Sequence, residues 1–123
     1  MDIDLNKINK VLNKAFVLEL RKIVSQIIIE EALLKYITQI VQSTRKNPSL
    51  FLGASPRASL AILNSAKACA CLRNRDFVTP EDIKYVCFPV LRHRIILTPE
   101  KEMEGIQIDT VIQQIIDKVE VPR

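Results

Sequence analysis

Glycine is nearly absent from this sequence: only 2 of its 123 residues are glycine, and there are four phenylalanines, two tyrosines and no tryptophan. So few glycines leave little material for the tight turns of a fold made of many short strands. No apolar run approaches the ~20 residues of a membrane span. The acidic start, Met1 to Asp4, lacks the layout of a signal peptide. We therefore expect a soluble helical protein without a membrane partner, located in the cytoplasm.

The familiar constellations of catalytic residues are also missing. Gly53 and Gly105 stand alone, so there is no glycine-rich phosphate loop. No Asp-Glu pair follows an apolar strand where it could hold magnesium. The single histidine, His93, has no acidic or cysteine neighbour at ligand spacing. We expect this chain to complete no chemistry on its own.

The three cysteines show no disulfide framework, which indicates reduced thiols. Cys69 and Cys71 are two residues apart on a predicted helix, so their side chains point roughly 160° apart and are poorly placed to share a metal ion. We expect small core residues and no metal site. A thiol enzyme using Cys69, Cys71 or Cys87 would need a base, and none stands at a suitable spacing.

The net charge is +4, from 18 basic and 14 acidic residues. Apart from local pairs such as Arg45-Lys46, the basic residues are spread along the chain, whereas a nucleic-acid binder concentrates them on one face. The composition therefore does not favour nucleic acid as a partner. A free-standing basic helical module that binds nucleic acid or a protein stays open as the alternative function.

Apolar residues recur at steps of three and four, which is typical of helices. The pattern predicts helices over 6–28 (in one or two pieces, broken near the β-branched residues 27–29), 30–45, 56–73, 80–91 and 109–119, with a short helix from Thr98-Pro99 to Gly105. Residues 49–56 are predicted to be a loop, and residues 92–97 a possible short extended segment. The fold class is therefore all-α, a bundle of five or six helices.

Several residue types indicate how these helices begin and pack. Ser55 is predicted to cap the helix over 56–73, with Pro56 as its first residue. Thr79 and Pro80 open the next helix in the same way, and because capping explains Asp82 in its first turn, we assign this segment no chemistry. In the core we expect the stripe Leu33, Leu34, Ile37, Ile40, Val41 and Thr44, together with Leu63 and the alanines of 56–73.

Arg57 is the first candidate functional residue. It follows Gly53, Ser55 and Pro56 into the first turn of a predicted helix, where a cation is unfavourable by roughly 0.3–1 kcal/mol. Such an arginine is either incidental and solvated or directed at an anion, and with the free N–H groups of a helix start it could reach a phosphate. Local physics leaves both interpretations open and favours the solvated one.

The second candidate is the segment Arg92-His93-Arg94 at the exit of a predicted helix. Cations at a helix C-terminus suit its dipole. The same cluster could instead form an inter-domain contact or face a phosphate, and the sequence does not separate the two interpretations.

Taken in order, these segments resemble the C-terminal lid of the MoxR family of AAA+ ATPases. The resemblance covers about residues 29–123 and rests on Tyr36-Ile37, Thr44-Arg45, Gly53-Ala54-Ser55-Pro56-Arg57-Ala58, Arg75-Asp76-Phe77-Val78-Thr79-Pro80-Glu81-Asp82, Leu91-Arg92-His93-Arg94-Ile95 and Val119-Glu120-Val121-Pro122-Arg123. The Gly-Ala-Ser-Pro-Arg stretch matches the sensor 2 motif of that family. The resemblance therefore implies that Arg57 is the sensor 2 arginine, which reaches the γ-phosphate of ATP.

The resemblance further implies a lid over 29–123, with 1–28 as a helical lead-in from an α/β ATPase domain that would precede Met1. That domain would carry the Walker A and Walker B motifs, sensor 1 and the arginine finger, and would bind ATP and Mg²⁺, while this chain alone would bind nucleotide weakly and would not hydrolyse it. The parent would be a chaperone-like ATPase in a homo-oligomeric ring, with a client that these residues do not name. The segment Val78 to Ile83 is also similar to the last helix of histone-fold proteins, but Asn47-Pro48 breaks the chain too early for the long central helix of that fold.

Overall fold

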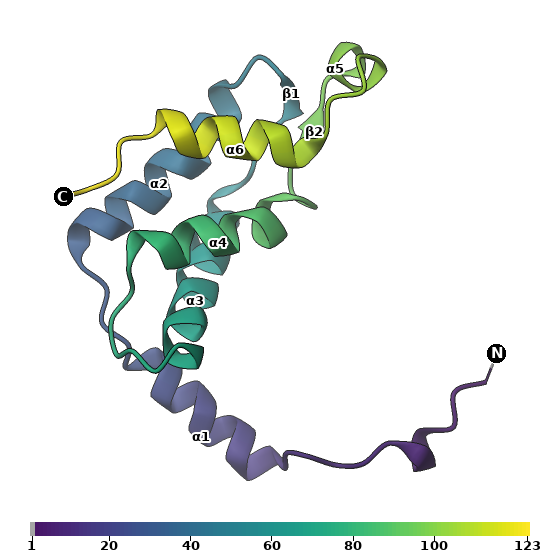
Figure 1. The fold of residues 1–123 in the computed structure, drawn as a ribbon, viewed down its shortest axis with the longest axis vertical. Helices are drawn as coiled ribbons and strands as arrows, with labels where there is room; N and C mark the ends of the chain where they lie inside the picture. Colours follow the sequence, from purple (N-terminus) through teal and green to yellow (C-terminus); the bar gives the residue numbers. More distant parts are fainter. Residues whose placement is uncertain (1) are drawn as a thin grey trace.

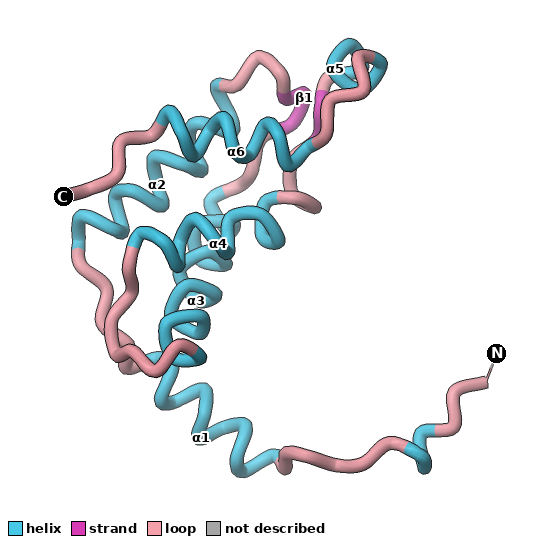
Figure 2. Tube along the Cα trace, viewed as in Figure 1, coloured by secondary structure: helices cyan, strands magenta, loops and turns pink. Residues whose placement is uncertain are grey.

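Six α-helices, one short 3₁₀-helix and two short strands make up residues 2–123, which are the residues that the computed structural model describes (Figures 1 and 2). In chain order they are η1 (Leu5–Lys7), α1 (Lys14–Ser25), α2 (Glu31–Lys46), β1 (Leu50–Leu52), α3 (Pro56–Leu72), α4 (Pro80–Leu91), β2 (Ile96–Leu97), α5 (Pro99–Met103) and α6 (Ile108–Lys118). The predicted all-α bundle is therefore confirmed.

The core lies between α2, α3, α4 and α6. Each of these helices buries one stripe of apolar side chains, as its periodicity predicts. The α3 stripe contains three fully buried alanines, Ala58, Ala66 and Ala70, beside Ile62. Small side chains let helices approach closely, and α3 packs more extensively on α4 than on any other element.

One expected core position is wrong, because Leu34 is 39% exposed. Leu63, like Ala61, packs against the core but is only partly buried. Leu63 lies one residue after Ile62, so it is turned by about 100° from the α3 stripe. The fully buried residue at this level of the helix is Ile62.

The helix boundaries follow local capping chemistry. Thr79 caps α4 through its side-chain oxygen, as predicted, and Thr98 caps α5 in the same way. Asn74 adopts a positive φ of 58°, and the N–H of Arg75 then bonds to the carbonyl of Ala70, which closes α3 in a Schellman motif. Gly105, with φ of 76°, closes α5 in the same way.

A two-stranded antiparallel sheet corrects part of the predicted loop. Leu50 pairs with Leu97 and Leu52 with Ile96, with an irregularity between the two pairs. The possible extended segment near 92–97 is therefore confirmed at Ile96–Leu97, but residues 50–52 are a strand and not loop. The apolar Leu-Phe-Leu sequence gains backbone partners from a segment more than forty residues away, and local propensity does not show such pairing.

The N-terminal segment differs most from the prediction. Within 6–28, only Lys14–Ser25 forms an α-helix, and residues 8–13 form no regular secondary structure. Neither η1 nor α1 carries a buried residue, and the segment reaches away from the bundle (Figure 1). α1 touches α3, whereas residues 8–13 are exposed throughout, and periodicity without tertiary contacts does not hold a short helix. After Ile27, Ile28 forms an isolated parallel bridge with Phe77, and from there the chain enters the bundle.

Within residues 2–123, no helix combines the length and the apolar character that crossing a membrane requires.

Candidate functional site

Arg57 is the second residue of α3 and is exposed. It makes no hydrogen bond or ion pair within residues 2–123, and the first turn of α3 contains no acidic residue. Its cationic head therefore lies at the positive end of the helix dipole without compensation from its own helix. This arrangement leaves the guanidinium available to a group from outside the described chain.

The loop before Arg57 is tied to the last turn of α2. The backbone N–H of Ala54 donates to Thr44 Oγ1 at 2.9 Å, and Arg45 Nε donates to the carbonyl of Ala54 at 2.8 Å. The Thr44 hydroxyl in turn donates to the carbonyl of Val41 at 2.6 Å. Both polar backbone groups of Ala54 are thus bound by two adjacent residues, which fixes the point from which α3 starts.

Gly53 shows how closely this loop approaches α2. A Cβ at this position would lie 2.6 Å from the Cα of Arg45 and 2.8 Å from the carbonyl carbon of Thr44. Any side chain would have to displace helix backbone, so only glycine fits here. The predicted supporting residue Gly53 therefore lets the loop lie directly on α2.

Ser55 does not cap α3 with its side chain, so the predicted cap is wrong in this detail. Ser55 occupies the N-cap position and Pro56 is the first helical residue, as expected. The N–H that a cap would bind belongs to Ala58, and it donates to the backbone carbonyl of Ser55 at 2.9 Å instead.

The structure gives each side chain of Arg92-His93-Arg94 a partner within the chain. Arg92 forms two 2.9 Å hydrogen bonds with the carboxylate of Asp109 and so joins the end of α4 to α6. Arg94 donates to the carbonyl of Val90 at 2.7 Å and lies 2.6 Å from Nε2 of His93, whose Nδ1 faces a backbone carbonyl of α4. These contacts serve the helix end, as its dipole favours.

Asp82 makes more contacts than the capping role that the sequence pattern predicted. Its side chain is fully buried and completes the capping box with Thr79. It also accepts two hydrogen bonds from Arg75, at 2.6 and 2.8 Å, and one from Arg73 at 3.3 Å. Capping therefore does not account for the whole residue, because this buried carboxylate also joins the end of α3 to the start of α4 (Figure 1).

These contacts keep Asp82 ionised. Burial by itself would raise the pKa of Asp82, but the hydrogen bonds from Arg75 and Thr79 outweigh burial and lower the pKa from 3.8 to about 2. Because the folded-state pKa lies below that of the unfolded chain, this contribution is present above about pH 4 and is lost as the pH falls toward 2.

Asp82→Asn is expected to lower the unfolding free energy at pH 7 by about 2 kcal/mol, the equivalent of this pKa shift. The variant should also lose part of the decline in stability below pH 4. Urea denaturation at pH 7 and at pH 3 measures both effects. Asp109→Asn is the matched control, since its carboxylate also binds an arginine but is half exposed. Equal losses in the two variants would contradict the account of Asp82.

The cysteines occupy core positions, with Cys71 only partly buried. Burial raises the pKa of the Cys69 thiol and raises the pKa of the Cys87 thiol to about 12. These two thiols stay protonated near neutral pH, which does not favour thiol catalysis. Within residues 2–123, no group of three or more His, Cys, Asp or Glu side chains could hold a metal ion.

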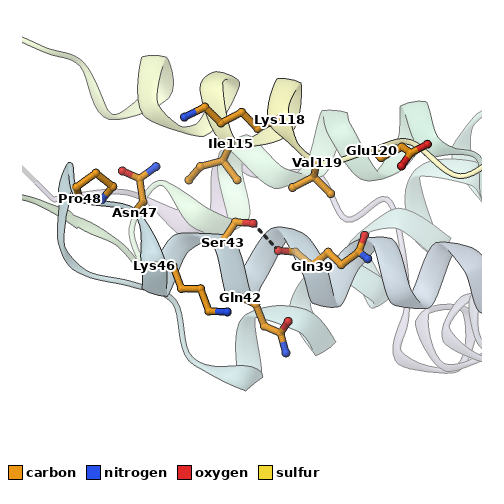
Figure 3. A pocket seen from close by; sticks show the side chains of 10 residues that line it. All are labelled: Gln39, Gln42, Ser43, Lys46, Asn47, Pro48, Ile115, Lys118, Val119 and Glu120. Carbon is orange, nitrogen blue, oxygen red and sulfur yellow. Dashed lines mark hydrogen bonds between the residues drawn. The ribbon is translucent and has the colours of Figure 1, made fainter.

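A groove of about 460 Å³ lies between α2 and α6 (Figure 3). Arg57 is not among the residues that line it. Gln39, Gln42 and Ser43 of α2 line the groove on one side, and Ile115, Lys118 and Val119 line it on the other. Its titratable lining residues are two lysines and Glu120, and no candidate site residue from the sequence lines it. The groove therefore does not belong to the site around Arg57.

Comparisons with known proteins agree on one family. The model of the AAA lid domain family matches residues 42–115. The uncharacterized protein YeaC of Bacillus subtilis is 42% identical over 103 residues, which cover 84% of this chain and 32% of that protein. Chaperone MoxR1 of Mycobacterium tuberculosis is 34% identical over 123 residues, covering 93% of this chain and 33% of that protein.

A solved structure matches equally well. The crystal structure of a candidate ATPase from Cytophaga hutchinsonii has a TM-score of 0.84 and 39% sequence identity, and the match covers 89% of this chain and 36% of that one. The chain thus spans about a third of the length of these relatives.

Proposed function

Since this chain belongs to the AAA lid domain family and is the lid of a MoxR-type AAA+ ATPase, we propose that it senses bound ATP through Arg57. In this proposal Arg57 is the sensor 2 arginine and contacts the γ-phosphate of ATP held by an α/β ATPase domain of the same protein. The lid would then convert the state of the nucleotide into a change of its own orientation.

The observation that supports this role is that the Arg57 side chain has no partner within residues 2–123, although the loop before it is fixed on α2. The side chain is exposed, while the preceding loop is bound to α2 through both the N–H and the carbonyl of Ala54. Arg92 and Arg75, by contrast, are both held by carboxylates. A phosphate oxygen would supply the anion that Arg57 lacks.

ATP would be a substrate in this scheme, and most of its binding would come from outside this chain. Within the described residues no three or more His, Cys, Asp or Glu side chains gather to hold a metal ion, and we propose that the ligands of Mg²⁺ belong to the ATPase domain. Hydrolysis would remove the γ-phosphate and with it the partner of Arg57. The lid would then be released from the nucleotide, which is an ordinary way for a nucleotide switch to move a domain.

Assembly and client belong to the same proposal. One relative is named a chaperone, and we propose that the intact protein is a chaperone-like ATPase that works as a homo-oligomeric ring on a client protein. We also propose that residues 29–123 form the lid and that 1–28 lead in from the ATPase domain. In agreement with a boundary near residue 28, the first buried residue along the described chain is Ile27.

The experiment that tests the sensing role is removal of the Arg57 side chain in the intact ATPase. Two readouts are needed: the rate of ATP turnover, and the ratio of affinities for an ATP analogue and for ADP. If neither changes in a correctly folded variant, Arg57 is not the sensor.

A further inference from the structure

We propose that Thr44 and Arg45 are positioning residues, which act through Ala54 to hold Arg57 where it can reach the nucleotide. This inference rests on the proposed function of Arg57 and extends it to the end of α2. Neither residue needs to touch the nucleotide, because their contacts are with the loop that starts α3.

The strongest observation is that both backbone polar groups of one residue, Ala54, are bound to the end of α2. Ala54 is 1% exposed, and its N–H donates to Thr44 Oγ1 at 2.9 Å while its carbonyl accepts from Arg45 Nε at 2.8 Å. Thr44 is itself 1% exposed, although its neighbours on the buried face of α2 are apolar. Buried polar groups need partners, and within residues 2–123 the hydrogen-bond partners of this hydroxyl are the backbone N–H of Ala54 and the backbone carbonyl of Val41.

The chain between Ala54 and Arg57 has little freedom to absorb a displacement. Pro56 has a φ fixed near −65° by its ring, and Ala58, which is fully buried, anchors the other side of Arg57. Gly53 lies so close to α2 that no Cβ fits. Movement of Ala54 away from α2 would therefore move the backbone of Arg57 with it.

A shift of the Arg57 backbone would weaken its contact with the phosphate, because hydrogen-bond geometry depends sharply on position. A displacement of about 1 Å in a positioning element lowers the efficiency of a site by up to about 100-fold. A long arginine side chain reaches a phosphate with well-aligned hydrogen bonds only if its backbone is held. Thr44 and Arg45 fix this backbone from the last turn of α2, which contains no other residue of the site.

The test measures the binding of ATPγS and of ADP to the intact ATPase. Thr44→Val keeps the shape of the side chain and removes the hydroxyl, so the N–H of Ala54 loses its partner. We expect the preference for ATPγS over ADP to fall about 3- to 10-fold, with ADP affinity unchanged. Thr44→Ser keeps the hydroxyl and should stay within about twofold of the wild type.

A double variant separates positioning from a general structural role. If Thr44 acts through Arg57, Thr44→Val in an Arg57→Ala background should lower the preference no further. Arg45→Met removes the second contact at an exposed position, so it should leave the fold intact, and we expect a 2- to 5-fold loss of the same preference. Circular dichroism and the thermal midpoint check the folding of each variant.

The outcomes distinguish this inference from the function on which it rests. If Arg57→Ala lowers the preference but Thr44→Val and Arg45→Met both match the wild type, the positioning role is wrong and the sensor stands. An additional loss in the double variant would also overturn the positioning role. If Arg57→Ala itself leaves the preference unchanged, the sensing function is wrong. Should Thr44→Val fail to fold, Arg45→Met alone decides the case.

Discussion

Replacing Arg57 with alanine in the intact ATPase is expected to lower the rate of ATP turnover by roughly 10- to 100-fold, mainly in kcat. A hydrogen bond to a charged group contributes about 1.5–3 kcal/mol, and each 1.4 kcal/mol is a factor of ten in rate. Stability should hardly change, since Arg57 is exposed and makes no contact within residues 2–123 that its loss would break. Steady-state ATPase kinetics, with circular dichroism on the same sample, measure both effects.

Two control variants make this result specific. Arg57→Lys keeps the charge but not the planar fork of donors, so it should recover only part of the rate. Lys67→Ala removes the other basic residue of α3, more than two turns further along the helix, and should leave turnover unchanged. An Arg57→Ala protein that turns over ATP at the wild-type rate would refute the sensor assignment.

Replacing Ile62 with alanine is expected to lower the free energy of unfolding by about 2–5 kcal/mol, a large part of the total for a domain of this size. Ile62 is fully buried on the stripe of α3 that also contains Ala58 and Ala66. The methyl side chains of these alanines cannot rearrange to fill the cavity that the loss of the isoleucine would leave. A cavity of this kind adds to the loss of transfer free energy.

The next residue along α3 is a matched control. Leu63→Ala removes a side chain of similar volume, but Leu63 is only partly buried, so its loss should be clearly smaller than that of Ile62→Ala. Urea denaturation followed by far-UV circular dichroism measures both variants, and Ile62→Val should cost only about 0.5–1.5 kcal/mol. Equal losses at positions 62 and 63 would show that the α3 stripe has been misplaced.

Local chemistry explains which parts of the fold can be predicted from the sequence. The Thr79-Pro80 start of α4, with its acidic first turn, carries its own capping box and needs no distant partner to be recognised. The break near residues 27–29 and the stop at Gly105 are equally local. The family resemblance, carried by ordered short segments, is confirmed by the match of the AAA lid model over 42–115.

Features that depend on distant partners were missed. The strand Leu50–Leu52 exists because Ile96–Leu97 lies beside it. The side-chain cap predicted at Ser55 failed for a local reason, because the N–H of Ala58 donates to the backbone carbonyl of Ser55 instead. The apolar periodicity of residues 6–13 predicted a helix, but these residues are exposed and gain no packing against the bundle.

The candidate site divides in the same way. Arg57 could be singled out from its place after Ser55-Pro56 and from the family resemblance, and its role stays a prediction. Thr44 was expected as a member of an apolar stripe and as part of the family resemblance, without a role of its own, yet its hydroxyl binds Ala54 ten residues later. A hydroxyl within an otherwise apolar stripe at a helix end was the available signal, because a buried hydroxyl needs a partner.

The central claim, that Arg57 contacts the γ-phosphate, is tested most directly by solving the structure of the intact ATPase twice, once with a non-hydrolysable ATP analogue and once with ADP. The account predicts that an Arg57 nitrogen lies within about 3 Å of a γ-phosphate oxygen in the first structure. It also predicts that the lid has turned relative to the ATPase domain in the second. If Arg57 faces solvent in both structures and the lid keeps one orientation, the sensing role of this lid is contradicted.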